Sequence, residues 1–425
     1  MTYIRNHPFY CIHKWAGFFL FGLLFLLGIS PVGAQDFGLV LRGQSTENRG
    51  EEDQGDFEYS GAISPWFAAP LGEQGDLYLS GGFSMKREKE TPYEFQPEPK
   101  LQAWYWQPIP ELYRFELAYR FATNLRINVG RILYQEPLHS ILDGLIDGVS
   151  VAWHPGNTRL SAGAFYTGLL YKKTAYIAMN SSDSANYFDR DTYFASKRMV
   201  FSLGWEINSL FNSGGVFDLS VLGQFDLNGK DDWIHSQYGE VMLKAPLPGN
   251  FTVDLGLILG LLEDRSGPLP FSFAAQTGLI WFPPSAANDR LTLGASFSSG
   301  VWSDRIGAFL PINSIPIGRV LQPAFSGIAL VQGGYARKLL NSFFVEVSAV
   351  YFFRTDTKTF FDLDLDQISL SPLLGGEVSG SLIWAPVSDL SFVLEGGAFL
   401  PQTGNAFNSD AAVKWQISLE TIFSF

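Results

Sequence analysis

Apolar and polar side chains alternate residue by residue along most of this chain, and this pattern restricts the fold more than any other feature. In residues 111–122 one face carries Tyr113, Phe115, Leu117, Tyr119 and Phe121, and the other carries Arg114, Glu116, Ala118 and Arg120. A period of two is that of a β-strand with one apolar side and one polar side. After Ala34 no apolar run of about 18 residues is uninterrupted, which excludes a bundle of membrane-spanning helices.

The same alternation returns in residues 217–227, 343–353, 378–384 and 413–425. Phe343, Val345 and Val347, for example, lie opposite Glu346 and Ser348. Such repetition predicts an all-β protein in which every strand has one polar face.

The first 34 residues predict a cleaved secretory signal peptide. A polar stretch with Arg5 and Lys14 precedes an apolar run over residues 15–29, and small residues follow it. Val32 and Ala34 fit the two small-residue positions of a signal-peptidase site, so we expect cleavage between Ala34 and Gln35. Residues 35–425 then form the exported domain.

Composition narrows the class of protein further. Only 17% of the residues are charged, against about 25% in a typical soluble domain, while aromatic residues reach 15%. Loss of Arg5 and Lys14 with the signal peptide takes the formal charge from −13 to −15, which argues against a nucleic-acid partner. The single cysteine, Cys11, also lies in the signal peptide, so the exported chain has no disulfide or thiol chemistry.

The lengths of the connections between strands separate a membrane barrel from a soluble sandwich. Counted back from Phe425, short and longer connections alternate over fourteen consecutive turns and loops, as they do in outer-membrane barrels. This alternation predicts an antiparallel up-and-down β-barrel of eighteen strands, with sixteen as the fallback. The count of eighteen requires residues 101–121 to form one strand, although Pro108 and Pro110 lie within it.

Two parts of the chain resemble the alginate-export-like porins. The first comprises residues 111–120, 125–131 with the Gly130-Arg131 step, and 147–151, and the second comprises residues 375–384 and 390–401. The resemblance implies an eighteen-stranded outer-membrane channel for hydrophilic solutes. The alginate exporter itself has a strongly basic pore, whereas this chain is acidic, so the resemblance does not predict which substrate this protein transports.

The last strand resembles the C-terminal signal that the barrel-assembly machinery of Gram-negative bacteria reads. Ile417, Leu419, Phe423 and Phe425 lie on its apolar face, and the chain ends on the aromatic Phe425. We therefore expect a location in the bacterial outer membrane, with outer-membrane lipid, the assembly machinery and periplasmic chaperones as partners.

The polar faces of the strands predict the lining of the lumen. The candidate pore-lining residues are Arg114, Glu116, Arg120, Arg126, Asp218, Asp226, Asp254, Glu346, Arg354, Glu377, Glu395, Lys414 and Glu420. Opposed charges across a pore select solutes by charge and size, but the same charges also serve to neutralise one another. The excess of acids predicts a mild preference for cations. Arg131 shares the parity of the apolar Ile127 and Val129, and a bulge at Gly130 decides whether it turns inward.

Catalytic and metal-binding patterns are missing from the sequence. His139, His154 and His235 form no nucleophile or zinc spacing, so we predict no enzyme activity, no cofactor and no metal site. Asp362, Asp364 and Asp366 alternate with apolar residues, which fits a solvated strand face better than a calcium site.

Three functions compete at this stage. A passive channel for small hydrophilic solutes or ions agrees with the polar strand faces. A transporter for a specific substrate is the first alternative. A transporter for hydrophobic substrates would need an N-terminal plug and an apolar lumen, whereas Gln35 is followed at once by a strand pattern that leaves no room for a plug. A non-conducting adhesin or structural barrel is the second. The long loop of residues 169–197 is rich in aromatics, and we expect it to fold inward as a constriction.

Overall fold

The computed structural model describes residues 35–49, 56–89, 104–210, 214–229, 231–284, 289–313, 316–362 and 364–425. The predicted signal peptide and Ala34 lie outside these residues. The strands are β1 (Asp36–Arg49), β2 (Asp56–Leu71), β3 (Gly75–Lys89), β4 (Trp104–Ala122), β5 (Leu125–Gln135), β6 (Asp143–Trp153), β7 (Thr158–Tyr166), β8 (Arg198–Leu210), β9 (Gly215–Asp226), β10 (His235–Leu247), β11 (Phe251–Asp264), β12 (Gly267–Pro268), β13 (Ser272–Trp281), β14 (Asp289–Ser298), β15 (Ile328–Leu340), β16 (Phe343–Arg354), β17 (Leu373–Val387), β18 (Leu390–Leu400) and β19 (Lys414–Ser424).

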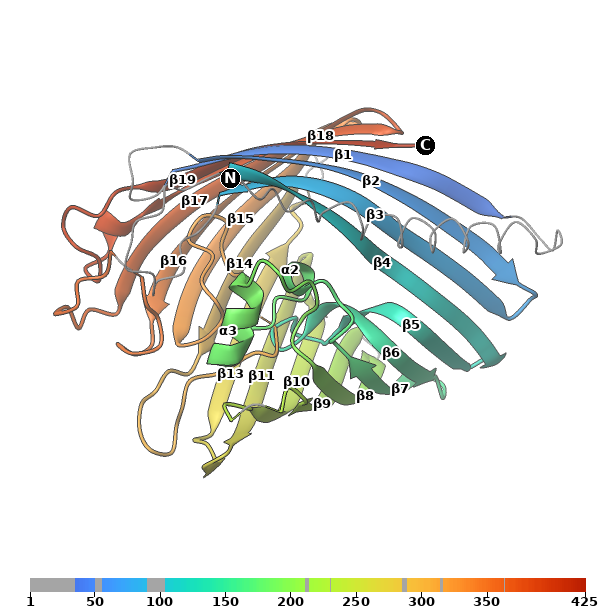
Figure 1. Cartoon of the computed structure of the whole chain (residues 1–425), viewed down its shortest axis with the longest axis horizontal. Coiled ribbons are helices and arrows are strands. Elements are labelled where there is room, and N and C mark those ends of the chain that lie inside the picture. The colour runs from blue at the N-terminus through green and yellow to red at the C-terminus, as the bar shows by residue number, and fades with distance from the viewer. Residues whose placement is uncertain are drawn as a thin grey trace, which may run out of the picture.

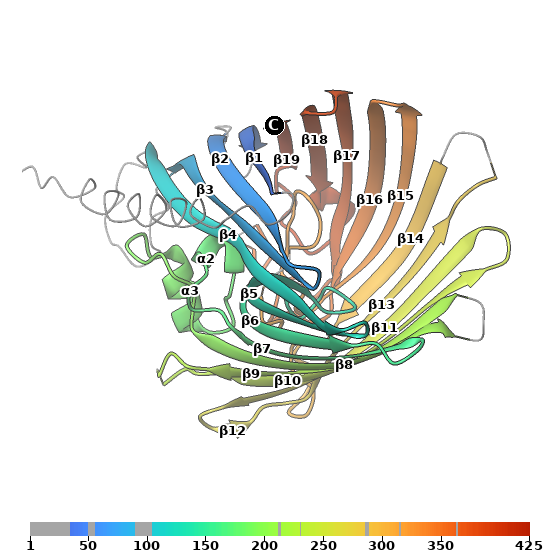
Figure 2. The same ribbon diagram turned by 90° about the vertical axis from the view of Figure 1, so that its right-hand side faces the viewer.

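These strands form one closed antiparallel barrel (Figures 1 and 2). Each strand pairs with its neighbours in sequence, and β1 pairs with both β2 and β19, which closes the sheet. The two residues of β12 pair only with the end of β11, and β11 pairs directly with β13, so eighteen strands form the wall. The predicted fold class and the count of eighteen are confirmed, and the fallback of sixteen is wrong.

The two faces of the wall differ as the alternation predicted. Leu203, Leu257, Leu293 and Val331 point outward and are each about half exposed, as are most large apolar residues of the same parity. The long connections lie at one end of the barrel, called the loop end here, and the short turns lie at the other, the turn end. Among the described residues no helix is long and apolar enough to cross a membrane.

The inside of the barrel is less polar than the sequence indicated. At the loop end, inward-facing Val200, Leu222, Ile258 and Phe352 are completely buried. They belong to one apolar cluster with the loop residues Leu138, Ile141, Phe309, Ile312 and Phe407. Burying apolar side chains away from the water of a lumen is favourable by roughly 1.5–3 kcal/mol each, so these contacts hold the loops inside the barrel.

Strand β4 is a single strand, as the count required, but its loop-end half lacks one neighbour. The β3 register reaches Trp104, whereas the β5 register stops at the pair of Phe115 with Arg131. A shift in the β3 register between Ser80 and Gly81 leaves Tyr113 as an extra residue, which is a β-bulge. The wall is therefore split between the loop-end parts of β4 and β5, and we call this split the β4–β5 gap.

Two glycines bend the neighbouring strands beside the gap. Gly130 has a φ of +117°, and a Cβ atom there would lie 2.1 Å from the Phe115 carbonyl oxygen. A Cβ on Gly148 would lie 2.2 Å from the Ala164 carbonyl oxygen. Only glycine fits such close backbone approaches, so these two positions allow β5 and β6 to depart from β4.

Candidate functional site

Two loops from opposite parts of the sequence meet inside the barrel. Residues 136–142 connect β5 to β6, and residues 299–313 and 316–327 belong to the connection between β14 and β15. The N–H of Ile312 donates to the Ile141 carbonyl oxygen at 2.8 Å, and the Asn313 side-chain amide donates to the Asp143 carbonyl oxygen at 2.7 Å. The lumen is therefore crossed by a pair of joined loops.

The connection between β14 and β15 is attached to the barrel wall by one carboxylate of β17. Glu377 of β17 accepts the backbone N–H groups of Arg319 at 2.7 Å and of Val320 and Leu321 at 3.0 Å. The Arg319 guanidinium also forms an ion pair with Glu395 of β18 at 3.0 Å. These contacts place residues 319–322 next to the inner face of β17–β19.

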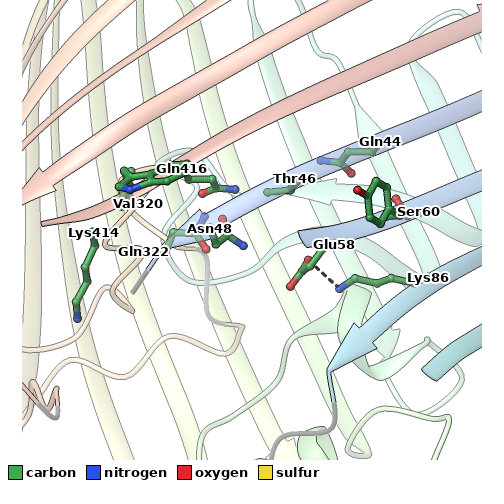
Figure 3. Close-up of a pocket in the computed structure, with 12 residues that line it drawn as sticks. Gln44, Thr46, Asn48, Glu58, Ser60, Lys86, Val320, Gln322, Lys414 and Gln416 are labelled. Carbon is green, nitrogen blue, oxygen red and sulfur yellow. Dashed lines mark ion pairs between the residues drawn. The ribbon is translucent and has the colours of Figure 1, made fainter. Parts of the chain in front are cut away.

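A polar cavity of about 460 Å³ remains between this loop and the wall (Figure 3). We call it the lumenal cleft, and its walls come from β1, β2, β3, β19 and the loop. Its lining residues are Gln44, Thr46, Asn48, Glu58, Tyr59, Ser60, Lys86, Val320, Gln322, Lys414, Trp415 and Gln416. Most of these side chains carry an amide or a hydroxyl group.

The charged groups of the lumenal cleft are paired. Lys86 lies 3.8 Å from Glu58, and Figure 3 marks this ion pair. The Lys414 ammonium lies 2.9 Å from Asp362 and 3.4 Å from Asp364. The Asp362–Asp366 stretch thus holds a lysine with two of its acids, and the described residues contain no cluster of three or more His, Cys, Asp or Glu that could bind a metal ion.

A second polar region follows the inner faces of β1, β4, β5 and β19. Arg114 donates to Glu116, and Arg126 lies 4.0 Å from the same carboxylate. Arg42 forms an ion pair with Glu420 at 2.9 Å. Glu116 is buried between its two arginines, so one carboxylate offsets only one of the two positive charges, and the guanidinium groups stay half exposed.

The predicted pore-lining residues all have inward parity, but they fall into two groups. Asp226, Arg354 and Glu377 are buried beneath loops. Arg354 donates to the Ser371 carbonyl oxygen at 2.7 Å, and Asp226 pairs with Arg198. These three residues hold loops in place and do not meet open space. For the remainder, which are Arg114, Glu116, Arg120, Arg126, Asp218, Asp254, Glu346, Glu395, Lys414 and Glu420, a pore-lining role stays a prediction.

Arg131 has the outer parity that its neighbours indicated, and yet it is 6% exposed. It forms a bidentate ion pair with Asp147 at 2.8 Å, and donates to the carbonyl oxygens of Leu112 at 2.6 Å and Leu169 at 2.8 Å. Leu112 lies on the free edge of β4 and Leu169 begins the loop of residues 169–197. Arg131 therefore joins both sides of the β4–β5 gap, a position that the sequence could not predict.

The loop of residues 169–197 contains α2 (Lys172–Ala175) and α3 (Ser181–Phe188) and covers the β4–β5 gap (Figure 2). The Tyr193 hydroxyl donates to the Pro110 carbonyl oxygen on the edge of β4. At the start of α3, hydrogen bonds from the Ser182 and Ser181 hydroxyls and the Ser182 N–H lower the pKa of Asp232 to about 2. The expected inward constriction is thus made chiefly by the two joined loops described above, while this loop covers the opening in the wall.

Several residues of the site were not predicted from the sequence. Glu136, Arg198 and Glu240 are fully buried charged residues with hydrogen-bonded partners. Arg198 and Glu240 have inward parity on β8 and β10, which the period-two pattern of those strands indicates. Glu136 lies in a loop, where no periodic signal exists.

The closed wall, its apolar outer face and its polar cleft define an eighteen-stranded barrel with the fold of outer-membrane porins. Among solved structures, the chain is similar to Pseudomonas aeruginosa OccK2 (OpdF) in complex with glucuronate, with 12% identity, a TM-score of 0.60, and coverage of 92% of this chain and 98% of that one. It is also similar to OpdK with vanillate from the same bacterium, with 15% identity, a TM-score of 0.59, and coverage of 92% and 98%. A third, OccD3 (OpdP), has 12% identity and a TM-score of 0.55, with coverage of 93% and 92%.

No family model and no curated protein matches the sequence. Structural similarity at this level of identity establishes the fold. It confirms the strand number and barrel architecture that the resemblance to alginate-export-like porins implied, while membership of that family stays a prediction.

Proposed function

We propose that this protein is a channel of the bacterial outer membrane through which small hydrophilic solutes diffuse passively. The lumenal cleft is the observation that carries this proposal, because it provides polar space inside the barrel beside a loop that enters the lumen. The half-exposed apolar side chains of the outer face suit a lipid environment.

The chemistry of the lumenal cleft suits uncharged solutes rich in hydroxyl groups. Gln44, Asn48 and Gln416 provide amides, which donate and accept hydrogen bonds, and Thr46 and Ser60 provide hydroxyls. A carboxylate solute prefers an arginine or lysine without a competing acid, whereas Lys86 and Lys414 each lie beside carboxylates. The glucuronate and vanillate in the similar structures are both carboxylates, so this cleft differs from what those ligands need.

The other partners follow from the same proposal. Outer-membrane lipid contacts the wall, periplasmic chaperones accompany the exported chain, and the barrel-assembly machinery reads Ile417, Leu419, Phe423 and Phe425, all of which are exposed on the outer side. We assign the protein no catalytic role, no cofactor and no nucleic-acid partner.

Purified protein in planar bilayers and in liposomes tests the proposal. We expect discrete conductance steps, a reversal potential in a salt gradient that shows mild cation preference, and faster liposome swelling in glucose than in glucuronate. The double variant Gln44→Leu/Gln416→Leu removes two amides of the lumenal cleft and should slow glucose entry several-fold. Gln237→Leu, on the exposed outer face of β10, is the matched control and should leave the entry rate unchanged.

Each outcome separates the competing functions. Silent bilayers would contradict the channel and favour a non-conducting adhesin or structural barrel. Conductance with glucuronate faster than glucose would keep the channel but overturn the preference for uncharged solutes. Conductance that one solute class blocks at low concentration would favour a transporter for a specific substrate.

A further inference from the structure

The loop of residues 136–142 reaches across the lumen rather than over its neighbouring strands. It starts from β5 and returns to β6, but it also contacts β10, β11 and β13, and β7, β8 and β9 lie between. Leu138 packs so closely on β11 that a Cβ atom on Gly256 would lie 2.2 Å from its Cδ2. Gln276 of β13 donates to the Ser140 hydroxyl. These contacts hold the loop across part of the lumen.

Two carboxyl groups meet where this loop touches β10. The Leu138 N–H lies 2.7 Å from Glu136 Oε2 and 2.6 Å from Glu240 Oε1, so one donor lies between the two carboxyls. Glu136 is 1% exposed and Glu240 is not exposed at all. Among the described residues neither forms an ion pair with lysine, arginine or histidine. Two ionised carboxylates this close and this far from water repel strongly, so one of them holds a proton.

The two carboxyl groups differ in the hydrogen bonds that they accept. Glu136 accepts three backbone N–H groups of its own turn, from Leu138, Ser140 and Ile141. Glu240 accepts only the Leu138 N–H and the Ser220 hydroxyl, the latter at 2.8 Å. Glu240 accepts fewer hydrogen bonds than Glu136, so we assign the proton of the pair to Glu240.

One further acid lies near this pair. Asp218 on β9 interacts with Glu136, while Glu206 on β8 and Arg159 on β7 interact with Asp218. The Tyr134 side chain on β5 lies near both carboxyl groups of the pair. Arg159 lies 3.5 Å from Glu206, which offsets its charge. His139 Nδ1 of the same loop lies 2.7 Å from Asp143 Oδ2, and the His139 side chain is half exposed, so this contact faces the solvent.

We propose that a proton on Glu240, where Glu136 and the Leu138 N–H meet it, holds residues 136–142 across the lumen, and that loss of this proton releases the loop and widens the pore. Burial in apolar surroundings raises the pH at which a carboxyl group loses its proton. The loop is then held at acidic and neutral pH and released at alkaline pH. This regulation rests on the channel function proposed above.

Single-channel conductance between pH 6 and pH 10 tests the proposal. We expect the conductance of the wild-type protein to rise at least two-fold above about pH 8. Glu240→Gln keeps the size of the side chain and donates an N–H to Glu136 but has no proton to lose, so its conductance should stay at the low-pH value throughout. Glu73→Gln, in the exposed turn between β2 and β3, is the matched control and should keep the wild-type step. A step that persists in Glu240→Gln overturns the proposal.

Hydrogen–deuterium exchange provides a readout that does not need a conducting channel. At pH 9.5 the peptide that contains residues 136–142 should exchange at least ten-fold faster in the wild-type protein than in Glu240→Gln, and comparison at one pH removes the intrinsic pH effect. Equal exchange overturns the proposal. Silent bilayers together with this difference in exchange rate would contradict the proposed channel function but support the proposal that a proton holds the loop. If Glu240→Gln does not fold, Glu136→Gln is used in its place, because it also removes one carboxyl group of the pair.

Discussion

Arg198 is a fully buried cation at the loop end of β8. Its guanidinium contacts Asp183 of α3 and lies 2.8 Å from Asp226 of β9, and it donates to the Ile234 carbonyl oxygen at 2.9 Å. Neither the arginine nor the two carboxylates have any exposed side-chain surface. Residues from β8, α3 and β9 thus meet at the Arg198 guanidinium.

Replacement of Arg198 by methionine should destabilise the loop end. The change leaves two buried carboxylates without a cation, which costs about 3–5 kcal/mol. The exposed pair of Arg265 with Asp231 offers a matched control, and Arg265→Met should cost roughly 1 kcal/mol or less. The measurement is the denaturant concentration at which protease cleaves residues 169–197 in the purified barrel. Equal values for the two variants would show that the buried network contributes little.

The two prolines of β4 are explained by the β4–β5 gap. Pro108, Pro110 and Leu112 direct their backbone groups to the same side of the strand, and Tyr193 and Arg131 donate to the carbonyl oxygens of Pro110 and Leu112 on that side. A proline has no N–H, so the two prolines leave no unpaired donor on this free edge. They are compatible with a strand because that edge has no β5 partner.

Removal of the Arg131 side chain should open the β4–β5 gap. Arg131→Met deletes the ion pair with Asp147 and two hydrogen bonds to carbonyl oxygens, a loss on the order of 2 kcal/mol that corresponds to a roughly 30-fold change in opening. Arg126→Met, on the same strand with a half-exposed side chain, is the control. Limited proteolysis should cut residues 169–197 far faster in Arg131→Met, and cleavage at the same rate in both variants would argue against a role for Arg131 in closure.

At the scale of the whole molecule, the last residue both closes the barrel and ends the predicted assembly signal. Phe425 exchanges two backbone hydrogen bonds with Leu39, at 2.7 and 3.0 Å, while ten further residue pairs join β1 to β19. Its side chain is 60% exposed on the outer side. Closure therefore depends on the backbone, and the aromatic ring is available to another protein.

Phe425→Ala separates these two roles. Refolded in detergent, the variant should keep the unfolding temperature of the wild type within a few degrees, because the backbone pairing is unchanged. In cells, the amount in the outer membrane should fall several-fold. Phe37→Ala removes another exposed outer aromatic, on β1, and should leave the cellular amount unchanged. If both variants accumulate like the wild type, Phe425 is not part of an assembly signal.

The sequence alone determined the barrel, its strand number and the parity of its side chains. Alternation in residues such as Phe115, Glu116 and Leu117 depends only on the local geometry of a strand, and the alternation of connection lengths depends only on the up-and-down order of strands. Both patterns can be recognised from the order of residues along the chain, so neither pattern depends on contacts between distant parts of the sequence.

Only the tertiary structure decided what lies inside the barrel. Whether an inward residue lines open space, as in the lumenal cleft, or is buried beneath a loop, as Glu377 is, depends on which loops enter the lumen. Glu136 and Glu240 lie 104 positions apart in the sequence and meet because one loop crosses the lumen. Such contacts arise from closure of the sheet, which brings distant strands face to face, and no periodic pattern encodes them.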